Sequence, residues 1–101
     1  MLEAIFKENK MYHTHHYSGR TSLDYGHTHD YDGITSPARS GVPHIHYIAG
    51  CTTYDDGHRH YYALKTSPAY PVAGGHFHYI SGMTNISEEH YHLMKDRTSV
   101  D

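Results

Sequence analysis

Twelve of the thirteen histidines in this 101-residue chain form six His-x-His pairs, and only His16 lies outside a pair. Counted from the first histidine of each pair, successive pairs are separated by 14, 17, 14, 18 and 14 residues. The alternation of short and long spacings defines three pseudo-repeats of 31 to 32 residues, 13–43, 44–75 and 76–101. Internal repetition of this kind restricts the fold more than any other feature of the sequence, because each repeat must adopt a similar structure.

The residues that follow each pair are repeated as well, in the order His-x-His-x-apolar-x-x-x-Thr. The threonine is present in all six half-repeats, at Thr21, Thr35, Thr52, Thr66, Thr84 and Thr98. A glycine stands midway between the apolar residue and the threonine in four half-repeats, and Leu64 and Asp96 take its place in the other two. The two histidines, the apolar residue, the glycine and the threonine follow one another at intervals of two residues. This is the periodicity of a β-strand.

The two faces of the predicted strands differ in character. In residues 23–35, the alternation places His27, His29 and Tyr31 on one face, and Asp30 and Asp32 on the other. We therefore expect the imidazoles to point into the protein and the carboxylates to face solvent. In segments 44–52 and 76–84 the opposite face is apolar as well. We expect these two strands to be covered on both sides or to lie at a subunit contact.

The 14-residue spacing predicts hairpins. A turn centred on Thr21 would pair His13 with His29 and His15 with His27, which gathers four imidazoles on one face of one hairpin. The predicted fold is all-β, with six His-x-His strands in antiparallel hairpins that form a small sandwich or a barrel-like sheet. A parallel β-solenoid with stacked pairs is the alternative. We assign residues 1–11 to an N-terminal arm and residues 12–101 to a single domain.

Paired histidines on strands favour a metal site. Side chains at i and i+2 point the same way with Cα atoms about 6.5–7 Å apart, and two such pairs can converge on an ion at about 2.0–2.1 Å. A ligand set of imidazoles without thiolates suits Zn²⁺, Cu²⁺ or Ni²⁺. We predict three four-histidine sites, one per hairpin, with six shared sites as the alternative. The bound metal would serve storage, buffering or the stability of a scaffold. The candidate ligands are His13, His15, His27, His29, His44, His46, His58, His60, His76, His78, His90 and His92.

Two other functions remain open at this point. The recurring threonines and tyrosines can satisfy each ring by hydrogen bonding, so the pairs can also form a structural core without metal. Catalysis is less well supported, because an active site is normally single and no carboxylate recurs beside every pair. We therefore do not expect an enzyme, and a metal-dependent hydrolase is only a minor alternative.

The composition indicates a thin core and self-association. Apolar residues make up 37% of the chain, with two Phe, no Trp and eleven Tyr. In a small domain of this kind, metal cross-links, self-association or buried His and Tyr hydrogen bonds should add to the stability of the core, and we expect a homo-oligomer or filament. The net charge of −3 and the dispersed Lys and Arg argue against a nucleic-acid partner. Without an apolar run long enough for a signal peptide or a membrane span, we expect a cytoplasmic protein, with extracellular assembly as an alternative.

Several stretches of the chain resemble the YmaF family of bacterial proteins. They are Gly26-His27-x-His29, Thr35-Ser36-Pro37-Ala38, Gly41-Val42-Pro43-His44-x-His46, Asp56-Gly57-His58-x-His60 and Gly74-Gly75-His76-x-His78. The resemblance covers roughly residues 12–98. It implies the repeat architecture and a bacterial source, and it implies little about activity. Leu64 and Asp96 depart from the glycine of the repeat, so we expect the last hairpin to be less regular.

Overall fold

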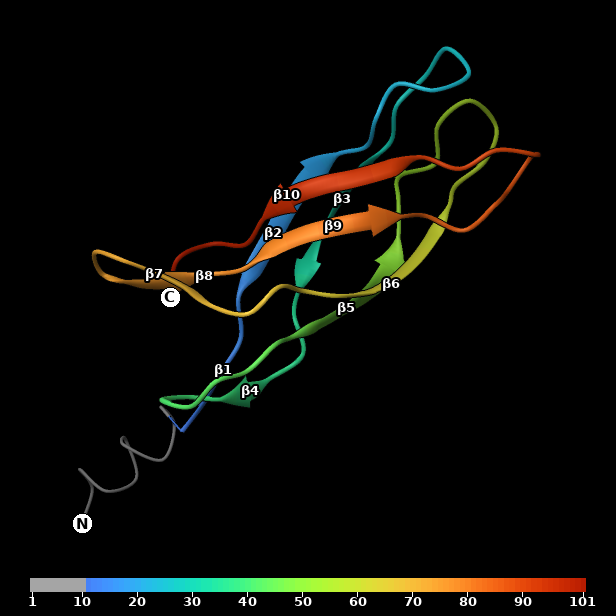
Figure 1. Ribbon diagram of the computed structural model, residues 1–101. Helices are drawn as coiled ribbons and strands as arrows, with labels where there is room; N and C mark the ends of the chain where they lie inside the picture. Colours follow the sequence, from blue (N-terminus) through green and yellow to red (C-terminus); the bar gives the residue numbers. More distant parts are fainter. Residues whose placement is uncertain (1–10) are drawn as a thin grey trace.

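The structure, a computed structural model, describes residues 11–101, and these residues form strands and no helix (Figure 1). The all-β prediction is confirmed. The predicted N-terminal arm, 1–11, lies outside the described residues except for Met11. Within the described part there is no helix long and apolar enough to cross a membrane. The strands are β1 (Tyr12–His13), β2 (His16–Arg20), β3 (Asp30–Ile34), β4 (Ala38–Arg39), β5 (Tyr47–Cys51), β6 (Tyr61–Lys65), β7 (Tyr70–Val72), β8 (Gly75–Phe77), β9 (Tyr79–Met83) and β10 (Leu93–Arg97).

Three long hairpins dominate the fold: β2 with β3, β5 with β6, and β9 with β10. Two short ladders, β1 with β4 and β7 with β8, lie at the connections between them. Every ladder among residues 11–101 is antiparallel and two-stranded. The antiparallel hairpins are as predicted, whereas these residues form neither a parallel solenoid nor a closed barrel.

The hairpins turn four residues later than the sequence analysis placed them. Tyr17 pairs with Gly33, so the first turn is centred on Tyr25 and Gly26 and not on Thr21. Both turn residues have positive φ, 53° and 82°, which is the signature of a type I′ turn. Asp56 and Gly57 form the equivalent turn of the second hairpin with φ of 55° and 84°. The predicted pairing of His15 with His27 is therefore wrong.

The three hairpins surround a common axis and contact one another in a ring, β3 against β5, β6 against β9, and β10 against β2. Their turns lie together at one end of the molecule, and the connections between hairpins lie at the other (Figure 1). Backbone hydrogen bonds join neighbouring hairpins near both ends. Near the turns, for example, the Thr53 N–H donates to the carbonyl of Asp30 at 2.8 Å, and near the connections the Ser36 N–H donates to that of Tyr47 at 2.8 Å.

One inward-facing apolar residue from each strand of the three long hairpins fills the centre of the ring. Glycines on the opposite strands make room for the largest of these residues. Tyr17 lies opposite Gly33 in its ladder, and Tyr62 lies opposite Gly50. The hydroxyls of these two tyrosines are 2.8 Å apart. The exceptions to glycine stand opposite smaller partners, since Leu64 faces Ile48 and Asp96 faces Ile80. The last hairpin is therefore as regular as the others. The buried core residues are Tyr17, Tyr31, Ile48, Tyr62, Ile80 and Met94.

Substitution of Gly33 by alanine is expected to destabilise the protein by about 1–3 kcal/mol, the usual cost of overpacking. A Cβ at this position would lie 2.6 Å from the Tyr17 hydroxyl oxygen and 2.9 Å from the ring carbon that carries it. Ser18→Ala on the exposed face of β2 is the matched control, with an expected change within about 0.5 kcal/mol. Urea unfolding of both variants measures the difference. Equal stability of the two would contradict the packing described here.

Candidate metal centres

The twelve paired histidines gather in two clusters, one at each end of the ring of hairpins. We call the first the link-end cluster, because His13 and His76 lie on β1 and β8, in the short ladders at the connections between hairpins. Its members are His13, His15, His44, His46, His76 and His78. The second, the turn-end cluster, consists of His27, His29, His58, His60, His90 and His92. Each hairpin contributes one pair to each cluster. All twelve candidate ligands are therefore placed in clusters of histidines.

The clusters differ from the three four-histidine sites that the sequence predicted. His13 and His15 lie at one end of the first hairpin, and His27 and His29 lie at the other end. The cause is the position of the turn at Tyr25 and Gly26, which lengthens the hairpin and separates its two pairs. Histidines from different hairpins come together instead.

Ring nitrogens within each cluster are close enough to bind one ion. In the link-end cluster, one ring nitrogen of each of the six residues lies within 4.8 Å of all the others. In the turn-end cluster the same holds for five residues, and the Nε2 atom of the sixth, His90, lies 3.2 Å from Nε2 of His58 and 3.3 Å from that of His60. The geometry thus allows each cluster to hold a metal ion.

The second histidine of every pair is almost completely inaccessible to solvent. The exposed fraction is 0–1% for these residues, which are His15, His29, His46, His60, His78 and His92. Each is fixed by the threonine of the repeat on the opposite strand. In the first hairpin, for example, the His15 N–H donates to Thr35 Oγ1 at 3.0 Å, and the Thr35 N–H donates to the His15 carbonyl at 2.9 Å. The ladder therefore continues through the histidines and holds their rings toward the axis.

The protonation of these buried rings follows from their hydrogen bonds. In all six, Nδ1 lies 2.7–3.0 Å from a backbone carbonyl of a neighbouring hairpin. A carbonyl oxygen only accepts hydrogen bonds, so Nδ1 carries the proton. In a neutral ring Nε2 is then an unprotonated acceptor, and it points into the cluster. This is the tautomer and orientation that protein metal sites use.

At the turn end, Nδ1 of the other three rings also faces a carbonyl, here that of the residue two positions earlier in the turn of the same hairpin. Nδ1 of His27, His58 and His90 lies 3.2, 3.2 and 3.0 Å from the carbonyls of Tyr25, Asp56 and Glu88. In neutral rings, Nε2 is therefore the free acceptor; five of these nitrogens lie within 4.8 Å of one another, and that of His90 lies close to two of them. A hydrogen bond between two of them requires an additional proton and a charged ring. Burial opposes that charge, so a bound cation is the better way to satisfy the lone pairs.

The contacts between Nε2 atoms are short. At the link end, Nε2 of His13 is 3.1 Å from Nε2 of His44 and 3.1 Å from that of His76. Two buried Nε2 atoms, those of His29 and His78, have no hydrogen-bond partner at all among the described residues. Buried acceptors without a partner cost about 1–3 kcal/mol each. The clusters are therefore polar centres that the protein alone does not satisfy.

The rings are arranged regularly. In the link-end cluster every ring meets four others edge to face, with centroids 4.5–5.1 Å apart and interplanar angles of 61–90°. In the turn-end cluster the corresponding values are 4.8–5.1 Å and 63–86°. Each ring has one opposite ring that it does not meet. At the link end, the opposite rings are His13 and His78, His15 and His44, and His46 and His76.

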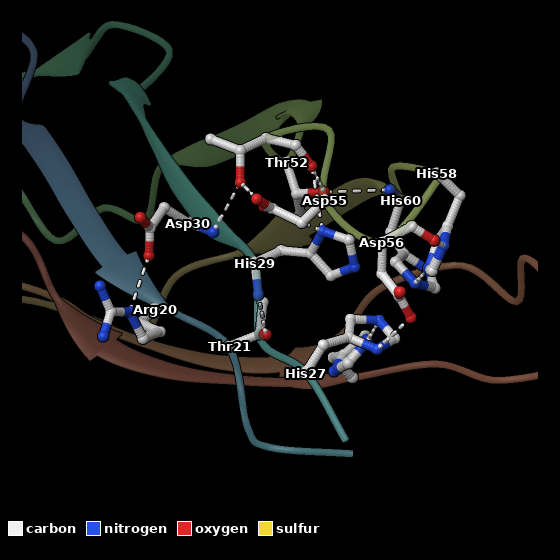
Figure 2. Close-up of polar contacts among 12 residues, drawn as sticks. Arg20, Thr21, His27, His29, Asp30, Thr52, Asp55, Asp56, His58 and His60 are labelled. Carbon is white, nitrogen blue, oxygen red and sulfur yellow. Dashed lines mark hydrogen bonds and ion pairs between the residues drawn. The ribbon is translucent and has the colours of Figure 1, made fainter. Parts of the chain in front are cut away.

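Three carboxylates lie beside rings of the turn-end cluster, and Figure 2 shows two of them, Asp55 and Asp56. Oδ2 of Asp56 lies 3.1 Å from Nδ1 of His27, and Oδ2 of Asp55 lies 3.5 Å from Nδ1 of His29. Oδ2 of Asp24 lies 3.6 Å from Nδ1 of His92. Carboxylates on the outer nitrogen of an imidazole increase its basicity as a metal ligand. The negative charges also offset part of the charge of a bound cation.

Burial lowers the pKa of several clustered histidines. Desolvation, followed by repulsion from neighbouring imidazoles, lowers the pKa of His13 to about 4. Desolvation also lowers the pKa of His78 to about 4, although its bond to the Ser67 carbonyl acts in the opposite direction. The pKa is lowered for the same main reason in His29, His46, His60, His76 and His92. These rings are neutral at pH 7, as metal binding requires.

Sequence analysis missed the residues that fix the rings from outside. The residue after each repeat threonine supplies the carbonyl that accepts the Nδ1–H bond, and its side chain accepts an N–H of the same neighbouring strand. Ser36, for example, binds Nδ1 of His46 through its carbonyl and the Tyr47 N–H through Oγ. The signal is a recurring Thr-[Ser/Thr/Asn] dipeptide, with Ser22, Ser36, Thr53, Ser67, Asn85 and Ser99 in its second position.

Comparison with known proteins supports the family resemblance. The YmaF family model, described as "Spore germination protein GerY/YamF", matches residues 3–67. The match covers the first two hairpins, with their four His-x-His pairs. No curated protein and no solved structure matches the chain. Because the family model spans more than half of the sequence, the chain belongs to the YmaF family.

Proposed function

We propose that this protein binds two transition-metal ions per chain, one in each histidine cluster. The observation that supports this most strongly is the turn-end cluster, where six rings have Nδ1 facing a carbonyl and Nε2 facing the centre. Imidazole ligands without thiolates suit Zn²⁺, Cu²⁺ and Ni²⁺, and also Fe²⁺. Cys51 is exposed and is not a member of either cluster, so it is not part of this ligand set.

We further propose that the ions act as structural cross-links. Each cluster takes its ligands from all three hairpins, so a bound ion would tie the three hairpins together at that end of the ring. A catalytic site needs a position open to substrate or water, and buried rings surround each centre. Structural binding is therefore favoured over catalysis. The family description suggests spore germination as the process in which such a protein acts.

Self-association is a second part of the proposal. The outward faces of β5 and β9 expose apolar side chains, including Tyr47 at 57%, Tyr79 at 44% and Met83 at 52%. The sequence analysis expected these strands to be covered or to lie at a subunit contact, and they are not covered within one chain. We propose that these faces form contacts between copies of the protein. Light scattering before and after chelation tests whether such assembly depends on metal.

Titration calorimetry of the metal-free protein with Zn²⁺ or Ni²⁺ near pH 7.5 is expected to give two bound ions per chain. His44→Ala with His76→Ala removes two partly buried ligands from the link end and is expected to reduce the stoichiometry to one strong site. His27→Ala with His58→Ala is expected to do the same at the turn end. Circular dichroism establishes that each variant is folded, and the intact cluster keeps one site available for measurement.

His16→Ala is the matched control for this titration. His16 is the one unpaired histidine, and it is exposed on β2. Its removal is expected to leave two sites with unchanged affinity. If the wild-type protein binds no ion more tightly than micromolar, the proposed function is wrong, and the histidines form a structural core.

A further inference from the structure

We propose that each histidine cluster is an octahedral site in which six imidazoles bind one ion. This inference rests on the proposed metal binding and specifies the coordination number and the class of metal. It selects divalent ions that favour six ligands, such as Ni²⁺, Co²⁺ or Fe²⁺, over Zn²⁺, which is almost always four-coordinate in structural sites, and over Cu²⁺, which favours square-planar or tetragonal geometry.

The neighbours of each ring follow the pattern of the vertices of an octahedron. Each vertex of an octahedron has four neighbours and one opposite vertex, and each ring of both clusters has four edge-to-face neighbours and one opposite ring. At the turn end the opposite rings are His27 and His60, His29 and His90, and His58 and His92, by the same criterion as at the link end. In a tetrahedron every vertex is a neighbour of every other, and there is no opposite position.

The distances between Nε2 atoms also agree with octahedral coordination. In an octahedron, neighbouring ligands are separated by the metal–ligand distance multiplied by the square root of two. The 3.1 Å between Nε2 of His13 and Nε2 of His44 therefore places an ion about 2.2 Å from each nitrogen. Opposite nitrogens would then lie about 4.4 Å apart, which agrees with the 4.8 Å within which all six link-end nitrogens lie. Tetrahedral zinc, at about 2.0–2.1 Å from nitrogen, would separate its ligands by about 3.4 Å.

A lower coordination number would leave buried Nε2 atoms without a partner, which is unfavourable. A four-coordinate ion would leave two Nε2 atoms of each cluster without a partner in a site lined largely by buried rings. His46, His60, His78 and His92 are fully buried, and their Nδ1 atoms are already committed to carbonyls. These rings cannot rotate outward without breaking those bonds. Six-fold coordination satisfies all the nitrogens at once, which is why the proposal assigns every pair to a ligand role.

Cobalt provides the direct test, because Co²⁺ absorbs visible light much more strongly in a tetrahedral site than in an octahedral one. Metal-free full-length protein is loaded with Co²⁺, and its visible spectrum is recorded. X-ray absorption of the Ni²⁺-loaded protein gives the number of nitrogens and their distance. We expect weak octahedral absorption bands and six nitrogens at about 2.1–2.2 Å. His16→Ala is expected to give identical spectra.

The outcomes separate this inference from the proposed function. Strong tetrahedral cobalt bands, or four nitrogens at about 2.0 Å, would overturn six-fold coordination and leave metal binding intact. Failure of Co²⁺, Ni²⁺ and Zn²⁺ to bind would overturn both. His90→Ala provides a second measurement, because its ring lies at the edge of the turn-end cluster against Tyr25. In this variant we expect five nitrogens and one oxygen at the turn end, with six nitrogens kept at the link end.

Discussion

Removal of the bound metal by a chelator is expected to lower the melting temperature of this protein by roughly 30 °C. An ion present at about 1,000 times its dissociation constant stabilises the folded state by about 4 kcal/mol per site, and the proposed function has two sites per chain. In a domain of this size, each kcal/mol changes the melting temperature by about 4–8 °C. The effect is large because the central apolar cluster has only six buried side chains.

Differential scanning calorimetry of metal-loaded and chelated samples measures this shift. Addition of metal to the chelated sample is expected to restore the original melting temperature. The variant with His44→Ala and His76→Ala is expected to lose only about half as much stability on chelation, because one of its two sites is already absent. An unchanged melting temperature in protein freed of metal would instead indicate that the hydrogen-bonded core is sufficient.

Acidification of the metal-free protein from pH 7 to pH 4 is expected to unfold it. In the unfolded chain, histidines bind protons with a pKa near 6.5. Burial lowers the folded-state pKa of His13 and His78 to about 4. Between these two values the unfolded state binds protons that the folded state excludes, so stability decreases as the pH decreases through this range. For His78 alone, a shift of this size corresponds to about 3 kcal/mol.

Several factors set the size of this acid transition. The pKa is lowered in five further rings, which add to the effect, while carbonyl bonds to Nδ1 and the negative charge of Asp101 near His76 reduce it. Protonation of all thirteen histidines would change the formal charge from −3 to +10. Circular dichroism at a series of pH values follows the transition, and bound metal is expected to displace it to lower pH. Stability that is constant between pH 7.5 and 4.5 would contradict the burial of neutral imidazoles.

Much of the local structure could be predicted from the sequence. The two-residue period placed His29 and Tyr31 on the buried face of their strand and Asp30 and Asp32 on the exposed face, and the structure confirms this. The same alternation would put Tyr25 on the face of His27 and His29, whereas Tyr25 is 74% exposed in the turn. The period is reliable within the strand because only one register of inward and outward faces buries the imidazoles.

The position of the turn could not be predicted from that period. With a turn centred on Thr21, Tyr17 would pair with Tyr25, whereas it pairs with Gly33 in the structure. The pairing partner changes by an even number of residues, so both turns keep the same side chains on the same face. Turn chemistry distinguishes them, and it is clear in only one hairpin, where Asp56-Gly57 is a typical type I′ sequence. Glu88 and Glu89 adopt positive φ in the third hairpin without any such signal.

The assembly of the hairpins is also beyond the repeat pattern. The sequence shows that pairs recur, but the partners of each pair depend on how three hairpins close into a ring. That closure depends on residues after each threonine, such as Ser36, whose backbone and side chain both contact the next hairpin. The recurring dipeptide marks these residues, although it does not specify which hairpin they contact.

The most direct test of this account is elemental analysis of the protein purified without added metal or affinity resin from its native source. Two tightly held transition-metal ions per chain are predicted, one for each cluster of six histidines. Three ions per chain would instead match one site in each hairpin and contradict the grouping of the pairs. A folded protein that contains no metal and takes up none would contradict the central claim that these histidines are ligands.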